Sequence, residues 1–468
     1  MTSLFNAVNN TGRTANGAVT NISSLNPLVD LFFVIGSSRG KDIRESFRKA
    51  YTADKTLAAR IVLWARDARG GAGERQMFID LVKYLATFDR EMAARVLLRT
   101  PELGRWKDLV SFFETDLKEE AMSMIAVALA NGDGLCAKWM PRKGPAAAQL
   151  RRFLEIDARG YRKLLVSMTN VVETKMCAKD WNSIDFGKLP SLASARYQKA
   201  FGRNATEAYG AYLSALEKGE AKINAGAVYP YDIIKSTTYG NSVAANAQWK
   251  AQPDYCEGSN ERVLPVIDVS GSMGVSAGGM QNLSCMDVAI SLGLYISERC
   301  AGAFQDQFIT FSENPQMHKV TGTLNDRVNQ IRRSNWGYNT NLQAVFDLIL
   351  TAATRNRVPE TEMPTKVIIL SDMEFDEAAG SRSYSYSGRS TNFEAIDQKF
   401  KDAGYKRPDI IFWNLNAREG NVPVTAGEAG TALVSGFSPS LMRSILSGKN
   451  VTPFDIMMET IGKERYEF

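Results

Sequence analysis

Oxygen-bearing side chains follow apolar runs at three points in the C-terminal half of the sequence. Asp268, Ser270 and Ser272 belong to the string DVSGS, directly after the run RVLPVI. Thr340 precedes a helix-like stretch, and Asp372 follows the run TKVIILS. Hydroxyl and carboxylate oxygens are hard ligands, and a set of about six, water included, suits Mg²⁺, Mn²⁺ or Ca²⁺ rather than zinc or copper. The five residues predict a divalent-cation site, with Mg²⁺ as first choice. The alternative is that they only cap strand–helix turns.

The elements that must position these residues are short strands alternating with helices. The runs RVLPVIDVS, DQFITF, TKVIILSD, PDIIFWNL and GTALVSGF are separated by helix-like stretches such as CMDVAISLGLYISERC and NLQAVFDLILTAAT. Near-continuous apolar strands between helices predict a doubly wound α/β domain whose parallel sheet is covered on both faces. In such sheets bound molecules and ions lie at the carboxyl ends of the strands, and the residues predicted to bind the cation are at these ends.

The sequence lacks the residues that several common catalytic and metal sites require. His318 is the one histidine, so a catalytic triad or a histidine acid–base pair would depend on it alone, and we interpret it as structural. The five cysteines form no CxxC pair, which argues against a zinc site or a disulfide framework. GGAGER lacks the GKS or GKT ending of a phosphate-binding loop. We therefore expect a protein that is not an enzyme.

The N-terminal half is typical of successive helices. Stretches such as RQMFIDLVKYLATF repeat apolar residues at three- and four-residue spacing, and Gly or Pro interrupts them at ARGGAGE, RTPELG, NGDG and MPRKGP. This pattern favours an α-helical repeat array of HEAT-like type. The expected organisation is an N-terminal extension (1–25), the helical domain (26–222), a connecting segment (223–260) and the α/β domain (261–468).

Charge divides between the two halves. Residues 1–260 hold 36 Lys and Arg against 27 Asp and Glu, a net +9, whereas residues 261–468 hold 20 and 24, a net −4. A basic half suits an anionic partner such as RNA, and an acidic half suits a cation.

Basic side chains with interleaved aromatics make RNA binding a hypothesis for the helical half. Trp106 and Trp139 lie within these clusters but also fit a helical core, and Asp67, Glu74 and Asp108 can form structural ion pairs with the bases. The candidate RNA-binding residues are Arg69, Arg75, Lys107, Lys138, Arg142, Lys143, Arg151, Arg152, Arg162 and Lys163.

The order DxSxS, Thr, Asp resembles the metal-ion-dependent adhesion site of von Willebrand factor A domains. The resemblance implies that Ser270 and Ser272 bind the ion directly, that the threonine binds directly or through water, and that the aspartates bind mostly through water. A carboxylate from a protein partner would complete the shell. Two positions depart from the family: Asn341 and Glu374 stand where many members carry Asp and Gly. The insert 380–392 is expected near the metal face as a partner-binding or surface loop.

A helical array followed by a von Willebrand A domain resembles the Ro autoantigen and its bacterial relatives, with their TROVE module. The segments TANGAVTNISSLNPLVDLFF, WARDARGGAGERQMF, GRWKDLV, AKWMPRKG and VVETKMCAKDWNSIDFGKLPS are most similar to a branch of that group other than Ro itself. The resemblance implies helical repeats that can close into a ring, binding single-stranded RNA ends in the hole and structured RNA outside.

The leading hypothesis is thus a non-catalytic RNA-binding scaffold. A metal-dependent protein-interaction module is the alternative, and a metal-dependent nuclease the weaker one. The sequence shows no secretory signal and no apolar run long enough for a bilayer, so a cytoplasmic protein without a membrane partner is expected. Neither the RNA, the protein partner nor the oligomeric state follows from the sequence.

Overall fold

The computed structural model of this chain describes residues 3–237, 243–277, 283–300, 302–312, 314–334, 341–375, 392–416, 420–447 and 451–468. The chain forms two compact units made of non-consecutive segments. The sheet unit comprises Met1–Ile61, Tyr229–Asn241 and Asp254–Glu464, and the helical unit comprises Val62–Val228, Ser242–Pro253 and Arg465–Phe468. This grouping cuts across the four consecutive ranges expected from the sequence.

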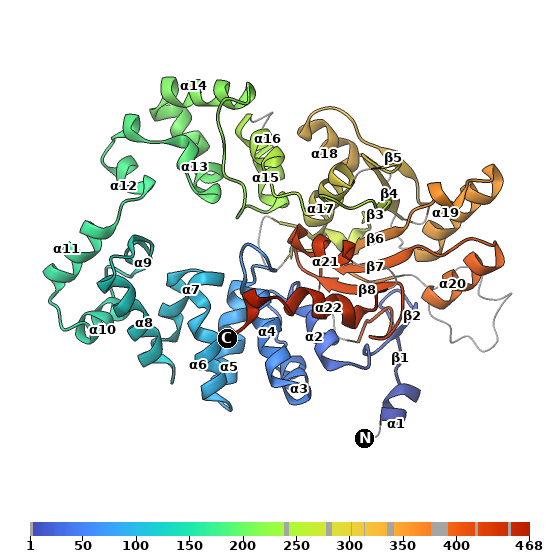
Figure 1. Ribbon diagram of the computed structural model, residues 1–468, viewed down its shortest axis with the longest axis horizontal. Coiled ribbons are helices and arrows are strands. Elements are labelled where there is room, and N and C mark those ends of the chain that lie inside the picture. The colour runs from blue at the N-terminus through green and yellow to red at the C-terminus, as the bar shows by residue number, and fades with distance from the viewer. Residues whose placement is uncertain are drawn as a thin grey trace. The chain divides into compact units, whose positions relative to one another are not determined.

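A six-stranded sheet forms the centre of the sheet unit (Figure 1). The strand order is β5-β4-β3-β6-β7-β8, and all neighbours pair in parallel except β4 and β5. Every residue of β3, β6 and β8 is buried, as in parallel sheets covered on both faces. The prediction of an α/β fold with a mainly parallel sheet is therefore confirmed for this unit. The strands are β3 Val263–Asp268, β4 Gln307–Phe311, β5 Met317–Lys319, β6 Lys366–Ser371, β7 Asp409–Asn414 and β8 Thr431–Ser435.

Helices of the same unit pack on this sheet, α17 on β3, α19 on β4, and α2 and α22 on β8. The helix α17 begins at a capping box formed by Ser284 and Asp287. It approaches β3 closely at Gly293, where a Cβ atom would lie 2.4 Å from Ile267 Cδ1. The helices of this unit are α1 Ser3–Val8, α2 Pro27–Ile35, α3 Arg44–Ala53, α15 Pro230–Thr237, α17 Cys285–Arg299, α18 Leu324–Arg332, α19 Leu342–Asn356, α20 Asn392–Asp402, α21 Met442–Leu446 and α22 Pro453–Ile461.

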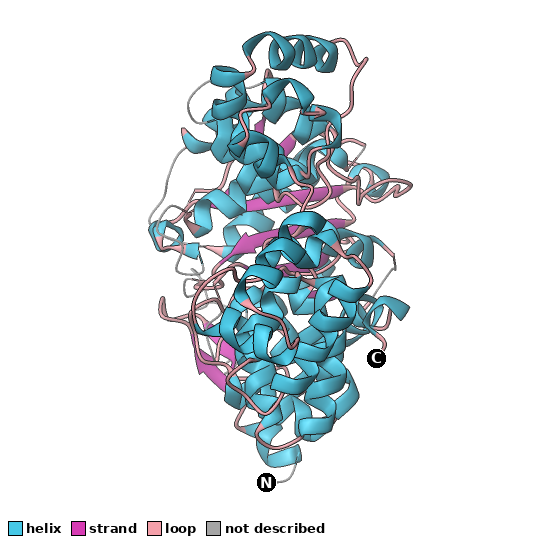
Figure 2. Cartoon of the chain, turned by 90° about the vertical axis from the view of Figure 1, so that its left-hand side faces the viewer, coloured by secondary structure: helices cyan, strands magenta, loops and turns pink. Residues whose placement is uncertain are grey.

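The N-terminal segment is part of the sheet unit. Outside the six-stranded sheet, the described strands β1 (Thr11–Arg13) and β2 (Val19–Asn21) form an antiparallel hairpin (Figure 2). The helix α2, which the sequence pattern placed at the start of the helical array, packs on β8 instead. The Ser435 hydroxyl donates to the Phe32 carbonyl at 2.8 Å, and the Asn414 amide to that of Phe33 at 3.2 Å. Burial of seven of the nine α2 residues explains this position, because so apolar a helix needs a broad covered face.

The helical unit consists of short helices that pack mainly on neighbours in sequence, including α5 on α6, α8 on α9 and α13 on α14 (Figure 1). One apolar cluster of this unit centres on Phe186, Phe201 and Tyr209. The helix α4 (Lys55–Arg66) crosses the division between the units. Among the described residues, no helix has the length and apolar character needed to cross a membrane. The other helices are α5 Arg75–Ala86, α6 Arg90–Leu98, α7 Thr100–Leu103, η1 Trp106–Phe112, α8 Lys118–Ala130, α9 Gly134–Trp139, α10 Pro145–Phe153, α11 Ala158–Met168, α12 Val172–Cys177, η2 Trp181–Ser183, η3 Phe186–Lys188, α13 Ser191–Asn204, α14 Thr206–Glu217 and α16 Val243–Lys250.

Candidate divalent-cation site and basic surface

The loop after β3 turns sharply so that its polar groups gather at the carboxyl end of the strand. Asp268 is fully buried, and its Oδ1 accepts the backbone N–H of Ser270 at 2.9 Å. A short 3-10 turn, η4 (Gly271–Gly274), follows. It places the Ser270 and Ser272 hydroxyl oxygens 3.0 Å apart, and Ser272 is partly exposed. Two hydroxyls therefore lie in front of a buried carboxylate.

The end of β6 lies beside this loop because β3 and β6 pair in parallel. The Ser371 hydroxyl donates to Asp268 Oδ2 at 2.5 Å, which joins the two strand ends directly. Asp372 follows, also fully buried, and its Oδ1 accepts the backbone N–H of Glu374 at 3.4 Å. The structure thus brings Asp268, Ser270, Ser272 and Asp372 to adjoining strand ends. Thr340 lies outside the described residues.

The electrostatics of the two aspartates fit a cation. Burial, together with the nearby Asp372 carboxylate, raises the pKa of Asp268 to about 7. Two buried carboxylates repel each other, and a divalent ion between them and the serine hydroxyls would relieve that repulsion. The described residues contain no group of three or more His, Cys, Asp and Glu side chains suited to a metal. An ion at these strand ends would meet hydroxyl and carboxylate oxygens, which suit Mg²⁺ or Mn²⁺ better than zinc.

The two positions that depart from the von Willebrand pattern have structural partners. Asn341 caps α19, its side chain accepting the N–H of Ala344 at 3.0 Å. Glu374 is only 4% exposed, and its carboxylate accepts the N–H of Ala15 at 2.6 Å and the Asn421 amide at 3.2 Å. Glu374 is therefore neither a solvated charge nor a free ligand. Of the insert 380–392, residues 380–391 lie outside the described residues, and Asn392 is the first residue of α20.

Two of the ten candidate RNA-binding residues, Arg75 and Lys138, form ion pairs within the helical unit. Arg75 pairs with the buried Asp108, which also binds the buried Arg66. Lys138 pairs with Glu173 at 3.1 Å. Arg69 reaches the Glu102 carbonyl at 3.4 Å. Asp108 is thus an ion-pair partner within the fold, and the paired Arg75 and Lys138 have less charge to offer a ligand.

The remaining candidates include a concentrated basic surface on α10 and α11. Residues 142–163 contain seven Lys and Arg but only two Asp and Glu. Phe153, beside Arg152, is 42% exposed, an aromatic that charge patterns did not single out. We call Arg142, Lys143, Arg151, Arg152, Arg162 and Lys163 the basic strip. Of these only Arg151 is half-buried, and no salt bridge joins any of them to a carboxylate in the described part of the chain.

Two tryptophans within the candidate clusters are half-buried. Trp106 donates its indole N–H to Asp133 at 3.1 Å. The Arg105 guanidinium and the Lys138 ammonium lie 5.5 and 5.4 Å from the centre of the Trp139 ring. Burial lowers the pKa of the Arg105 guanidinium. The Asp108 carboxylate opposes this shift, and neighbouring arginines, which include Arg75, add to it. Positive charge is therefore crowded beside the Trp139 ring.

Comparison with known proteins divides the chain near residue 262. Residues 262–466 match the domain of unknown function DUF7788, and residues 14–128 and 116–263 match the domain of unknown function DUF2828. The chain is also 28% identical to "Uncharacterized protein L728" of Acanthamoeba polyphaga mimivirus, in an alignment that covers 96% of this chain and 86% of the viral protein. Since the DUF2828 matches together span more than half of the sequence, the chain belongs to the DUF2828 family.

Proposed function

We propose that this protein is a non-catalytic RNA-binding scaffold whose helical unit binds RNA and whose sheet unit binds a divalent cation. The same division of roles is implied by the likeness to Ro-type proteins, with HEAT-like helices and a von Willebrand A-type domain. The observation that carries the RNA proposal is the basic strip, where positive charge exceeds negative charge and where no salt bridge to another described residue neutralises it.

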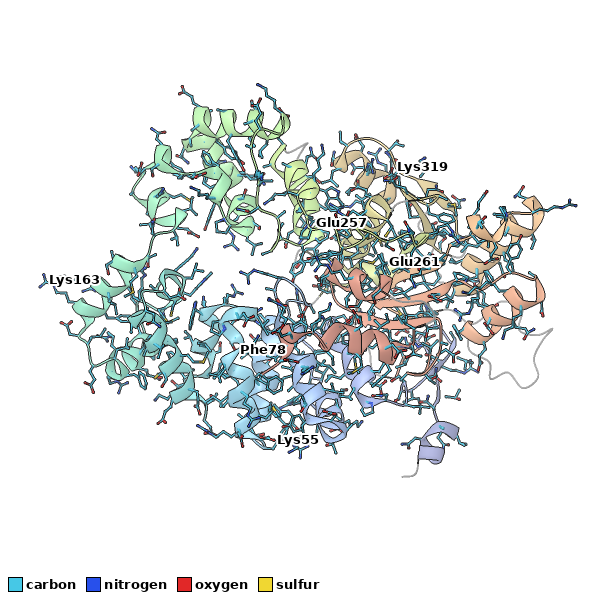
Figure 3. The ribbon with its side chains drawn as sticks, in the orientation of Figure 1. Lys55, Phe78, Lys163, Glu257, Glu261 and Lys319 are labelled. Atoms are coloured by element: carbon cyan, nitrogen blue, oxygen red, sulfur yellow. The ribbon has the colours of Figure 1, made fainter. Side chains whose placement is uncertain are left out.

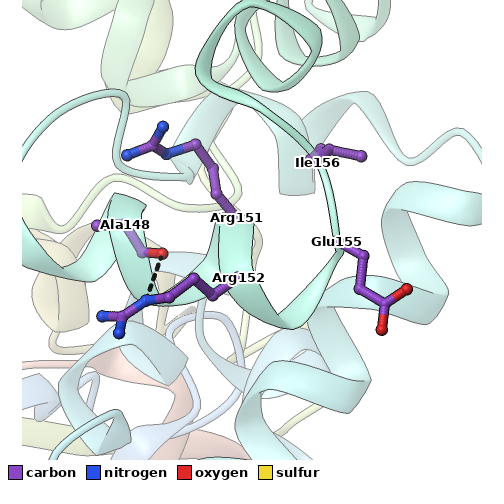
Figure 4. A pocket seen from close by; sticks show the side chains of 5 residues that line it. All are labelled: Ala148, Arg151, Arg152, Glu155 and Ile156. Atoms are coloured by element: carbon purple, nitrogen blue, oxygen red, sulfur yellow. Dashed lines mark hydrogen bonds between the residues drawn. The ribbon is translucent and has the colours of Figure 1, made fainter.

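The basic strip has the chemistry that RNA binding requires. Arg151 and Arg152 both line a surface pocket of about 370 Å³ at the end of α10 (Figure 4). The Arg152 Nε atom donates to the Ala148 carbonyl at 3.4 Å, which leaves its terminal nitrogens for a ligand. Lys163 projects from α11 at the outer edge of the helical unit (Figure 3). Cationic groups neutralise phosphates, and the exposed Phe153 ring offers a surface for base stacking.

Filter binding across a salt series tests this proposal. We expect a quadruple variant, R151A/R152A/R162A/K163A, to bind single-stranded RNA at least tenfold more weakly than the wild type. Its logarithmic salt dependence should be shallower by about 3 if all four groups touch phosphates. The control is R90A/R95A, which removes two arginines that pair with Glu120 and Glu91. Equal affinity of wild type and quadruple variant would exclude the strip as the RNA site.

A second candidate function is cation-dependent docking of a protein partner. It is favoured by the buried Ser270 hydroxyl and the partly exposed Ser272 hydroxyl, which lie 3.0 Å apart beside two buried aspartates. An ion there would have a coordination position for an Asp or Glu of the partner. A pull-down with and without EDTA tests this idea: a partner retained equally by S270A/S272A does not dock through the ion.

An RNA-cleavage assay with the purified protein tests the weaker alternative, a metal-dependent nuclease. RNA incubated with the protein and Mg²⁺ or Mn²⁺ should stay intact under conditions in which it binds. Cleavage that is lost in D372A would instead assign a catalytic role to the ion.

A further inference from the structure

The tip of the N-terminal hairpin contacts the segment that directly follows Asp372. We use "N-terminal hairpin" for residues 11–21, which comprise β1, β2 and the turn between them. The Thr14 hydroxyl donates to the Phe375 carbonyl at 2.6 Å, and the Asn16 amide to the Glu374 carbonyl at 2.9 Å. The Ala15 N–H donates to the Glu374 carboxylate at 2.6 Å. Three consecutive hairpin residues thus bind two consecutive residues after β6.

The base of the hairpin is held by a third segment, the loop after β7. Asn21 and Val422 exchange backbone hydrogen bonds of 3.0 and 2.9 Å, and the Thr20 hydroxyl lies 3.2 Å from Asn421 Oδ1. The Asn421 amide in turn donates to the Met373 carbonyl at 2.6 Å and to Glu374 Oε1 at 3.2 Å. Glu374 and Asn421 therefore link the hairpin to the chain beside Asp372.

The residue between Asp372 and Glu374 adopts a left-handed backbone conformation. Met373 has a φ of 66° although it carries a side chain, and that side chain is 1% exposed. Such a conformation persists only where surrounding contacts hold it. At Met373 these contacts are the Ser371 hydroxyl, 3.1 Å from its N–H, and the Asn421 amide on its carbonyl. The direction of the Asp372 side chain therefore depends on the same turn that Glu374 fixes from the other side.

We propose that Glu374 is a positioning residue that couples docking of the N-terminal hairpin to cation binding at Asp372. This inference rests on the proposed cation site and adds its regulation. With the hairpin docked, Glu374 holds the turn in the conformation that presents Asp372 to the ion. By linkage, a bound ion strengthens hairpin docking by the same factor by which the docked hairpin strengthens ion binding.

The test measures both sides of this linkage in the full-length protein. Hydrogen exchange followed by mass spectrometry reports hairpin docking through residues 11–21, and titration with Mn²⁺ reports ion affinity. Saturating Mn²⁺ should slow exchange of the hairpin in the wild type. In E374Q, hairpin exchange should be faster and Mn²⁺ affinity at least fivefold weaker. In E362Q, which removes an exposed carboxylate of the same unit, neither quantity should change.

A second variant guards against a general loss of structure in E374Q. N16A removes one hydrogen bond to Glu374 from the hairpin side and leaves the carboxylate in place. It should weaken Mn²⁺ binding in the same direction, by a smaller factor. Faster hairpin exchange with unchanged Mn²⁺ affinity in both variants overturns the coupling while the cation site stands. Wild-type protein that binds Mn²⁺ no better than D372A overturns the proposed cation site itself, and the coupling with it.

Discussion

The guanidinium of Arg465, three residues before the last residue of the chain, binds the buried carboxylate of Asp67. Its Nε and Nη2 atoms lie 2.5 and 2.9 Å from Oδ2 and Oδ1. The Tyr466 hydroxyl adds a hydrogen bond of 3.1 Å to the same carboxylate, and the Arg69 N–H one of 3.0 Å. These contacts fasten residues 398 positions apart within the helical unit.

We expect D67N to lower the free energy of unfolding by about 2–3 kcal/mol at pH 7. This value is below that for a fully buried pair, because Arg465 is partly exposed. Burial raises the pKa of Asp67, but the bonds from Arg465 and the backbone amides outweigh it and hold the pKa below its usual value. The carboxylate therefore stabilises the fold above its unfolded pKa of about 4, and this contribution is lost as the pH falls through the folded pKa.

Urea unfolding at pH 7 and pH 3, followed by tryptophan fluorescence, checks both the size and the sign. The difference between wild type and D67N should narrow at the lower pH. The control R95A breaks an exposed pair with Glu91 and should change stability by less than about 0.5 kcal/mol. A difference that is constant or wider at pH 3 would contradict the assignment to the ionised carboxylate.

Two glycines in helices should respond to alanine in opposite directions. At Gly293 in α17, a Cβ would lie 2.4 Å from Ile267 Cδ1 on β3, so G293A should destabilise the sheet unit by about 1–3 kcal/mol. At Gly210 in α14, no heavy atom beyond the local helix backbone and the two chain neighbours lies within 4 Å of the added Cβ. G210A should therefore raise stability by up to about 1 kcal/mol, because alanine favours the helix. Thermal unfolding of both variants measures these changes in stability. Equal changes in G293A and G210A would mean that α17 does not approach β3 this closely.

The parallel sheet could be predicted because buried strands leave a local signal. The runs that became β3 and β6 are almost wholly apolar, and the polar residues that end them mark the carboxyl edge of the sheet. The proximity of Asp268 and Asp372 follows from that pattern and from parallel pairing.

The partners of other segments could not be predicted, since periodicity reports a covered face but not what covers it. The apolar helix α2 looks alike whether it packs on helices or on β8. The hairpin strands have three residues each, too few to show alternation. Glu374 is acidic and follows a metal-type motif, so it resembles a solvated charge or a ligand. Its actual partner, Ala15, lies 359 residues away, and nothing local records such a contact.

The exposed ring of Phe153 should contribute to RNA affinity without contributing to stability. We expect F153A to weaken binding of single-stranded RNA by about 1–3 kcal/mol, the range for loss of one base-stacking aromatic. The melting temperature should stay unchanged, because the side chain is 42% exposed. The matched control is L135A, which removes an exposed apolar side chain of α9, 61% exposed, and should leave RNA binding as it was. Filter binding at fixed salt gives the comparison, and equal losses in both variants would point to nonspecific effects.

Divalent cations should stabilise the protein against heat through Ser270 and Asp372. A ligand that binds only the folded state adds about 2.7 kcal/mol of stability at 100 times its dissociation constant. Wild-type protein should therefore melt at a higher temperature in Mg²⁺ than in EDTA. S270A removes one hydroxyl donor and D372A one of the two buried carboxylates, so each should lose most of this difference. D372A should also gain stability in EDTA, because it removes the charge that repels Asp268. S438A, which deletes another buried serine hydroxyl of the same unit, should keep the full Mg²⁺ response. A Mg²⁺ response that S270A and D372A retain in full would place the ion elsewhere on the chain.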